Sequence, residues 1–422
     1  MNNKQYKAIP VDKGLDNTIN LLKEGYLFIQ NRMNSLNTDI FETRIMGQKT
    51  ICITGRGATR IFYNEELFRR KDATPKRIQK TLFGENAIQG KDGIQHFKRK
   101  LLFMDILSQE DEQKIANLVK DELMKSIDKW QHMDEIILFR EISQIITYVA
   151  CNWVGIYISK KEAKARSKDF LRMIYSFAEV GTKYRLGKEA RKNTERWVEG
   201  IVEQVREGRL VVGENSPLYK ICFFKDVDNK LLDNKIVAVE VINTIRPIVA
   251  VSTYAIFAVT ALYSHPLCKS KLLKNEDNYY EMFVEEVRRF YPFTPFVGAR
   301  VKERFIWHNY EFKKGTLVLL DVYGINHDPR IWDEPYIFNP DRFKDKEMIE
   351  ALYDFIPQGG GNPIKTHRCP GEGVTVKITQ SVINFLLNYI DFDVKKQDLS
   401  YSLSRIPTLP KSGFIITNVR RK

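Results

Sequence analysis

The chain has 422 residues, 43% of them hydrophobic, and a formal net charge of +14 at pH 7. Its 53 acidic residues are interspersed with 67 basic ones, and no basic motif with interleaved aromatic residues occurs, which argues against a nucleic-acid partner. The five cysteines are widely spaced and contain no CxxC pair, which argues against a disulfide framework and a zinc site. No linker-like stretch divides the chain, so we expect one compact domain over residues 1–422.

Two segments bear on the location of the protein. Residues 1–26 lack the apolar core that a signal peptide needs, which predicts a cytoplasmic protein. A later run from Pro247 to Cys268 contains no Lys, Arg, Asp or Glu, but it is interrupted by serine and threonine and lies far from both ends. We interpret it as a buried helix and expect no membrane span. The most basic stretch, 183–197, also carries glutamates, and we interpret it as a solvated helix face.

The expected elements are mostly helical. In chain order, helix-forming composition with spaced apolar positions predicts helices near 110–131, 159–180, 186–208, 235–264, 278–290 and 372–390. Short strands are expected near 41–54, 298–320 and 402–418. This pattern predicts a mainly α fold of the α+β class, with a large helical part and a small β-rich region.

Arg246 and Pro247 stand at the head of the most apolar run of the chain. Proline has no backbone N–H and disturbs the hydrogen-bond ladder of a helix, so it opens space beside the helix. Arginine stays charged at neutral pH and holds a carboxylate by two parallel, charge-assisted hydrogen bonds.

Two further pieces lie between residues 278 and 343. Glu286 and Arg289 are three residues apart and therefore neighbours on one helix face, although such a pair contributes only about 0.2–0.5 kcal/mol at a surface. The loop DEPYIFNPDRF at 333–343 has an irregular, proline-rich backbone. We expect its Arg342 to complete a buried network with Glu286 and Arg289.

The stretch FIPQGGGNPIKTHRCPGEG at 355–373 carries Cys369 just before a helix that is expected to begin near Val374. Three consecutive glycines let the backbone pass close to a bulky group. The N–H groups and positive dipole end of a helix lower the pKa of a thiol. The alternative is a cysteine that lies in this loop by chance, but the flanking glycines and the preceding His367 and Arg368 would then need a separate explanation.

Together these motifs resemble the cytochrome P-450 superfamily of haem-thiolate enzymes. The matching motifs are Glu286-x-x-Arg289, the loop from Pro335 to Phe343, and the glycine-rich loop that ends in Cys369-Pro370-Gly371. The resemblance implies haem b with Cys369 as the axial thiolate on iron, and a structural role for Glu286, Arg289 and Arg342. One departure is visible: Gly361 lies eight residues before the cysteine, where the usual pattern has a glycine four before it. The longer loop is expected to alter the face where redox partners dock.

The long apolar helix lacks the acid–alcohol pair with which oxygen-activating members relay protons; Arg246 and Pro247 stand in that region instead. By having Arg246 and Pro247 in place of that pair, the chain resembles the bacterial fatty-acid peroxygenases. Further matches to that family are VDKGLDNTINLLKEGY, TPKRIQKTLFGENAIQGKDG, TIRPIVA, EVRRFYPF, IPQGGG and PKSGF. The resemblance implies hydroxylation of long-chain fatty acids at the α or β carbon, with hydrogen peroxide as co-substrate, minor decarboxylation to terminal alkenes and no dedicated redox partner. It also implies that Arg246 clamps the substrate carboxylate, which serves as the acid–base group.

Other roles follow from the same resemblance, residue by residue. Arg70, His96 and Lys100 match positions that contact the haem propionates; the alternative is solvated surface charge. Gln89 matches a distal position that is histidine in members that favour decarboxylation, and glutamine cannot shuttle a proton as imidazole can. The expected channel for the acyl chain consists of Leu82, Phe83, Ile174, Phe177, Phe293 and Phe296. For each of these six, ordinary core packing is the alternative.

Two rival functions remain open from the sequence. A monooxygenase that draws electrons from a redox partner would keep the fold and the haem. A non-catalytic haem sensor would keep them too, but it would have little use for an arginine placed against the distal face.

Overall fold

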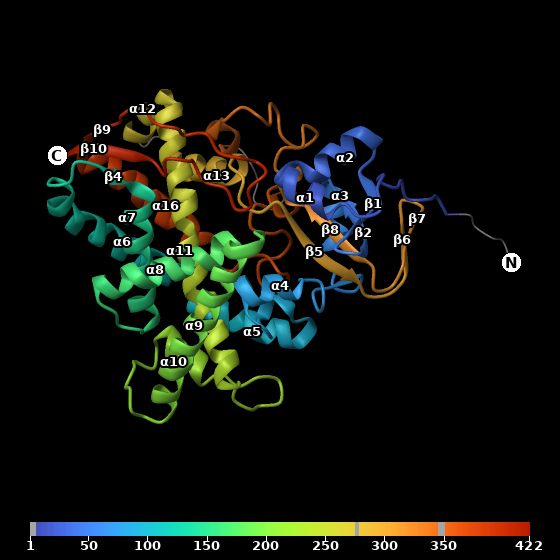
Figure 1. Cartoon of the computed structure of the whole chain (residues 1–422), viewed down its shortest axis with the longest axis horizontal. Coiled ribbons are helices and arrows are strands. Elements are labelled where there is room, and N and C mark those ends of the chain that lie inside the picture. The colour runs from blue at the N-terminus through green and yellow to red at the C-terminus, as the bar shows by residue number, and fades with distance from the viewer. Residues whose placement is uncertain (1–5, 275–277, 345–350) are drawn as a thin grey trace.

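The computed structural model describes residues 6–274, 278–344 and 351–422. Helices form one end of the elongated molecule, and a twisted sheet with its covering helices forms the other (Figure 1). The described chain begins at the sheet end and finishes at the helical end, while helix α11 (Asn234–Ser264) passes through the middle (Figure 1). The mainly α architecture with a small β-rich region is as predicted.

All six predicted helices are present, and most of their ends lie within a few residues of the expected positions. The longer helices are α2 (Phe28–Leu36), α5 (Gly93–Ile106), α6 (Gln109–Trp130), α7 (Leu138–Val154), α8 (Lys160–Ser176), α9 (Gly181–Arg206), α11, α12 (Pro266–Lys274), α13 (Tyr279–Phe290) and α16 (Glu372–Asn388). The shorter ones are α1 (Thr18–Glu24), α3 (Arg56–Phe62), α4 (Lys76–Ile78), α10 (Pro217–Cys222), α14 (Val322–Ile325), α15 (Ala351–Asp354), η1 (Gly25–Leu27), η2 (Gln79–Phe83), η3 (Ile88–Gly90) and η5 (Pro340–Phe343).

Several helix starts follow from capping side chains. Ser108 accepts a hydrogen bond from the Asp111 N–H at the start of α6, and Ser159 does the same for Glu162 at the start of α8. Helix α5 was not predicted because its apolar pattern is interrupted by charged residues. Those residues turn out to be buried, which bears directly on the site described below.

The strands form three small sheets. The strands are β1 (Ile40–Ile45), β2 (Gln48–Ile53), β3 (Phe68–Arg69), β4 (Ile136–Ile137), β5 (Phe296–Val301), β6 (Phe305–Trp307), β7 (Tyr310–Phe312), β8 (Leu317–Asp321), β9 (Ile390–Asp393) and β10 (Ile415–Arg421). The main sheet has the order β1-β2-β8-β5-β3, in which β8 runs parallel to β2 although most of the chain separates them. Figure 1 shows this pairing as orange strands beside blue ones.

One predicted strand is largely wrong. Of the segment 402–418, only the part from Ile415 onward is a strand, and residues 402–414 are irregular. Pro407 and Pro410 lie in the irregular part, and proline cannot donate to a sheet ladder.

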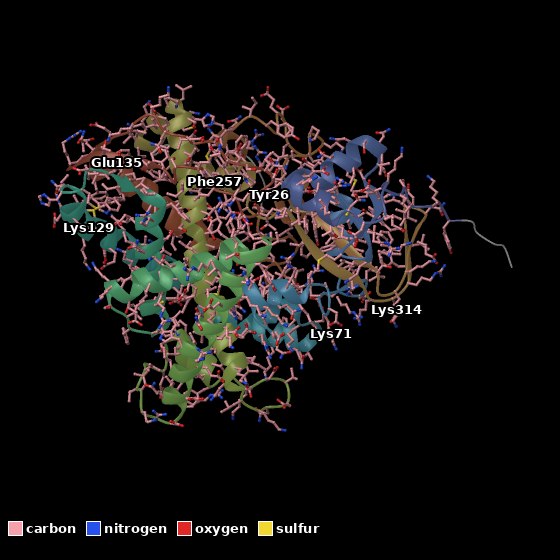
Figure 2. The ribbon with its side chains drawn as sticks, in the orientation of Figure 1. Tyr26, Lys71, Lys129, Glu135, Phe257 and Lys314 are labelled. Atoms are coloured by element: carbon pink, nitrogen blue, oxygen red, sulfur yellow. The ribbon has the colours of Figure 1, made fainter. Side chains whose placement is uncertain are left out.

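Helix α11 is the core of the helical part. It packs against α7, α9 and α16, and Figure 2 shows its Phe257 in the interior, with Lys71, Lys129 and Lys314 toward the periphery. Among the described residues it is the one helix apolar and long enough to cross a membrane, but 94% of its most apolar window is buried inside the molecule. A buried core helix therefore explains its composition. Pro247 lies within it and has no N–H to offer the Asn243 carbonyl one turn earlier.

Candidate haem and substrate site

Cys369 lies in the loop that leads into α16, and its neighbour Gln358 contacts it twice. The Cys369 N–H donates to the Gln358 carbonyl at 3.0 Å, and Gln358 Nε2 lies 3.8 Å from the Cys369 Sγ. Burial raises the pKa of the Cys369 thiol, as does the charge of Glu372, whereas the Gly371 N–H lowers it. The N–H at the helix start thus lowers the pKa of the thiol as expected, but burial outweighs it. A bound metal ion would overcome this, because coordination deprotonates a thiol.

The long loop before Cys369 is closed by its own backbone. Gly359 and Gly361 have φ values of +101° and +79°, which favour glycine, and a Cβ on Gly359 would lie 3.1 Å from the Arg368 Cα. Thr366 Oγ1 donates to the Gly360 carbonyl at 2.8 Å. The additional residues thus form a compact turn beside the cysteine.

The predicted ion-pair network is confirmed. Arg289 Nε donates to Glu286 Oε2 at 2.7 Å, and both side chains are fully buried. Arg342 Nε lies 3.2 Å from the same carboxylate oxygen. Arg289 also donates to the carbonyls of Asn326 and Pro335, at 2.8 and 2.9 Å. This network ties α13 to the 333–343 loop, as a structural role requires.

The three basic residues expected at the haem edge are buried rather than solvated. Arg70, His96 and Lys100 are 9%, 2% and 1% exposed, and the last two lie on one face of α5 because they are four residues apart. His96 stacks on His367 with ring centroids 3.7 Å apart, and Lys100 Nζ donates to the Arg368 carbonyl. These contacts bring the cluster to the cysteine loop.

The charges of Arg70 and Lys100 lack acidic partners among the described residues, whereas His96 Nδ1 lies 4.0 Å from Glu65 Oε1. No ion pair joins the Arg70 or Lys100 side chain to a carboxylate in the part of the chain that the structure describes, and the Arg70 guanidinium instead lies 4.3 Å from the centre of the Phe62 ring. Burial lowers the pKa of His96 to about 4 and that of Lys100 to about 8. An anionic group of a ligand would remove the penalty of burying these cations.

Arg246 is buried and lacks a partner. Its side chain is 6% exposed, its Nε is buried, and no hydrogen bond or ion pair involves its guanidinium among the described residues. Burial lowers its pKa to about 9, and nearby Arg191 lowers it too, while Cys369 acts in the opposite direction. The guanidinium carbon lies 5.6 Å from the centre of the Phe83 ring. Gln89 likewise has a buried Oε1 without a partner in the described chain.

Side chains that the sequence did not identify hold the segment that carries Phe83. Asn243 Nδ2 donates to the Phe83 carbonyl at 2.8 Å, and Arg191 donates to the Leu82 carbonyl at 2.9 Å. Glu240 Oε1 accepts from the N–H of Ile88 at 2.9 Å. Glu240, Asn243 and Arg246 follow one another at intervals of three residues. This spacing in the sequence indicates a polar face on an otherwise apolar helix.

The basic stretch 183–197 is not a fully solvated helix face as expected, because Arg191 within it is only 1% exposed. Its helix, α9, packs against η2, and the Arg191 Nε pairs with Glu195. Burial depends on that tertiary contact, which local charge does not reveal.

The six expected channel residues come from three segments, and the structure does not bring all six together. Leu82 and Phe83 end η2, which packs against α8 and α9. Ile174 is 2% exposed within the helical core, and Phe293 stacks on Tyr254 of α11 at 4.5 Å. Phe177 is half-buried.

Phe296 is placed differently. It packs against the smaller core cluster around Phe28 and Phe41 at the sheet end, not in the helical core that contains Ile174.

Comparison with known proteins agrees with this geometry. A family model described as cytochrome P-450 matches residues 274–415. The solved structure of cytochrome P-450EX alpha (CYP152N1) with myristic acid is 41% identical over 99% of this chain and 100% of that one, with a TM-score of 0.94. Ligand-free cytochrome P-450 OleT is 34% identical over 98% of this chain and 99% of that one, with a TM-score of 0.95. A variant of cytochrome P-450SP alpha (CYP152B1) is 36% identical over 97% of this chain and 100% of that one, with a TM-score of 0.94.

Curated relatives align over shorter parts. The bifunctional dihydrocamalexate synthase/camalexin synthase of Arabidopsis thaliana is 33% identical over 31% of this chain and 27% of its own. A (+)-piperitol/(+)-sesamin synthase of Sesamum radiatum is 26% identical over 55% of this chain and 48% of its own. These matches thus cover half or less of each curated relative, whereas the solved structures above match over nearly their whole length. The chain belongs to the cytochrome P-450 superfamily and, within it, to the CYP152 fatty-acid peroxygenases.

Proposed function

We propose that this protein holds haem b through Cys369 and uses hydrogen peroxide to hydroxylate long-chain fatty acids at the α or β carbon. The observation that carries the proposal is Arg246, a buried guanidinium whose donors have no partner among the described residues. Similar proteins have been solved with myristic acid and with arachidonic acid. Both ligands are carboxylates with a long apolar tail.

The residues present fit a haem. Cys369 is a free thiol in a glycine-rich loop, and the cations Arg70 and Lys100 are buried near this loop with no acidic partner in the described part of the chain. Two such cations suit the two propionates of haem b. When bound, haem would supply the iron chemistry that activates peroxide. His96, stacked against His367, would line the same edge.

Arg246 would bind the substrate through its carboxylate. A buried charge without a partner is costly, and a carboxylate that accepts two parallel hydrogen bonds removes this cost. The carboxylate is then held where it can accept and return a proton, a task that arginine cannot perform because it stays protonated. Pro247 contributes by leaving the helix ladder open at this point.

The clamp also determines where oxidation occurs. With the carboxylate fixed at Arg246, only the first carbons of the chain lie near the reacting centre, whatever the chain length. Leu82, Phe83, Ile174, Phe177 and Phe293 would contact the tail. Burial of the tail adds about 0.8 kcal/mol of affinity per CH₂ without changing the position of attack.

Gln89 would favour hydroxylation over decarboxylation. Its Oε1 is buried and unpaired within the described chain, so it is available to a ligand, but an amide does not exchange protons at neutral pH. Terminal alkenes are therefore expected as minor products.

The test is turnover without any reductase. Purified haem-loaded protein is mixed with a long-chain fatty acid and hydrogen peroxide, and we expect 2- and 3-hydroxy acids. Products that appear only when a reductase and NAD(P)H are added would favour a partner-dependent monooxygenase. A haem spectrum that no fatty acid perturbs would favour a sensor. Independence from a redox partner and a cytoplasmic location are parts of the same proposal.

A further inference from the structure

Arg288 is a buried charge that the proposed chemistry does not use. It precedes Arg289 in the sequence but belongs to a different set of contacts, and its side chain is 3% exposed. It pairs with Glu285 on its own helix and with Glu372 at the start of α16, the latter at 2.7 Å. Glu372 in turn pairs with Arg368, the residue before the cysteine. Arg288 is thus held firmly on the cysteine side of the site.

The third contact of Arg288 leads to the thiol. Its Nε donates to Gln358 Oε1 at 3.0 Å, and Gln358 Nε2 lies 3.8 Å from the Cys369 Sγ. The same Nε2 lies 3.1 Å from Thr375 Oγ1. The carboxamide therefore uses its oxygen toward Arg288 and its nitrogen toward both the threonine and the sulfur.

Chemistry allows only this orientation of the amide. A guanidinium has donors and no acceptor, so the atom of Gln358 that faces Arg288 must be the oxygen. Thr375 donates its own proton to the Gly371 carbonyl at 3.2 Å, so it accepts from Gln358. Arg288 and Thr375 together therefore direct an amide N–H of Gln358 toward the Cys369 sulfur. In a glutamine without such partners, the oxygen and nitrogen of the amide could not be told apart.

We propose that Arg288 is a positioning residue for the haem ligand: it fixes Gln358 so that an amide N–H points at the Cys369 sulfur and limits how much charge the thiolate donates to iron. Hydrogen bonds to a ligating sulfur are a main lever on the reduction potential of the metal. Removing this one leaves more charge on the sulfur, so the ferric state is favoured and the potential becomes more negative. The inference rests on the proposed ligation of haem by Cys369.

The test is the ferric/ferrous reduction potential of haem-loaded variants, measured without fatty acid or peroxide. Gln358→Leu removes the donor and is expected to make the potential more negative and to raise the iron–sulfur stretching frequency. Arg288→Lys keeps the charge, so Glu285 and Glu372 remain paired and the protein should fold. It loses the fixed donation to Gln358 and should shift the potential in the same direction, but by less. Thr375→Val, the matched control, removes only the second anchor and should give a smaller shift still.

The double variant decides whether Arg288 acts through Gln358. If it does, Arg288→Lys adds nothing to the potential in the Gln358→Leu background. An equal shift in both backgrounds would mean that Arg288 affects the potential independently of Gln358 and would overturn the inference. An unchanged potential in Gln358→Leu would overturn it as well. A wild type whose reduced carbonyl complex lacks the long-wavelength band would instead refute haem-thiolate ligation itself, so the two failures are distinguishable.

Discussion

The two sides of the site treat buried arginines in opposite ways. On the cysteine side, Arg289 is fully buried and paired with Glu286, and Arg288 is paired with Glu285 and Glu372. On the opposite side, Arg246 is nearly as buried but has no hydrogen bond or ion pair among the described residues. The paired arginines hold the fold together, whereas the unpaired one lowers the stability of the free protein and is available to a ligand.

This difference helps to distinguish structural from functional charges. A buried ion pair whose members satisfy each other gives little reason to look for a ligand. A buried cation with free donors, beside apolar side chains such as Phe83, implies an anion with an apolar body. A fatty acid has that composition.

The largest expected effect comes from removing the thiolate. Cys369→Ser should abolish peroxide-dependent turnover and the long-wavelength absorption of the reduced carbonyl complex, because a serine oxygen is not a thiolate donor. Both are measured on the purified variant. The control is Cys268→Ser, whose side chain lies 3.5 Å from the Tyr279 hydroxyl and keeps a partner. Retention of both signals in Cys369→Ser would show that another residue holds the iron.

The next prediction compares the two kinds of arginine directly. Arg289→Ala removes the closer of the two arginines that pair with the buried Glu286 carboxylate and should lower the free energy of unfolding by about 3–5 kcal/mol. Arg246→Ala removes a charge that has no partner among the described residues, so the variant should be at least as stable as the wild type and should keep its haem, while fatty-acid oxidation is lost. Arg246→Lys should restore part of the activity, because an ammonium cannot reproduce the two parallel hydrogen bonds.

Urea titration and product analysis test this pair of variants. A large loss of stability in Arg246→Ala, or full fatty-acid oxidation by it, would remove the contrast between the two sides.

A smaller effect is expected from Gln89. Gln89→His places a group that exchanges protons near neutral pH on the Arg246 side. The ratio of terminal alkene to hydroxy acid should rise, with total peroxide consumption similar. Gln89→Asn, which keeps an amide, is the control. Equal product ratios in the wild type and in Gln89→His would leave Gln89 without an influence on the outcome.

The smallest effect concerns Asp321, a buried acid at the sheet end of the molecule that has no ion-pair partner among the described residues. Burial raises its pKa from 3.8 to about 7, and its Oδ2 has no partner in the described chain. Since the folded protein binds this proton more tightly than the unfolded chain, its contribution to stability is complete below pH 3.8 and is lost as the pH rises to about 7. Asp321→Asn should make the free energy of unfolding fall less steeply between pH 3.8 and about 7, as measured by urea titration at several pH values.

The exposed Asp398 is the control for this measurement. Its pKa is lowered to about 2 by hydrogen bonds from Ser400, so its effect lies below the window. Asp398→Asn should leave the dependence of the free energy of unfolding on pH unchanged in this window. If Asp321→Asn leaves this pH dependence as it is in the wild type, the pKa of Asp321 is not raised by burial.

Much of the helical fold was predictable because the apolar spacing of α6, α8, α9, α11, α13 and α16 is regular. Residues 402–414 are irregular where a strand was expected, and Pro407 and Pro410 within them cannot donate to a sheet ladder. Helix α5 was missed because His96, Arg99 and Lys100 interrupt its apolar face. They are buried only in the context of the site, so their burial cannot be deduced from composition.

The site was predictable where motifs are local. Cys369, Arg246 and the Glu286–Arg289 pair stand out in short stretches of sequence. The side chains that hold them do not, because their partners come from distant segments: Arg191 donates to Leu82 across 109 positions, and Gln358 reaches Arg288 across 70. Such pairs become visible only when the chain is folded.

The most direct test asks whether Arg246 holds a carboxylate during peroxide cleavage. A small neutral substrate such as styrene or guaiacol carries no carboxylate, so the wild type with peroxide alone should oxidise it poorly. Added heptanoate, too short to be oxidised efficiently, should dock on Arg246 and increase the rate strongly, and Arg246→Ala should show no increase. Equal rates with and without heptanoate in the wild type, or hydroxylation near the methyl end of a fatty acid, would contradict the account.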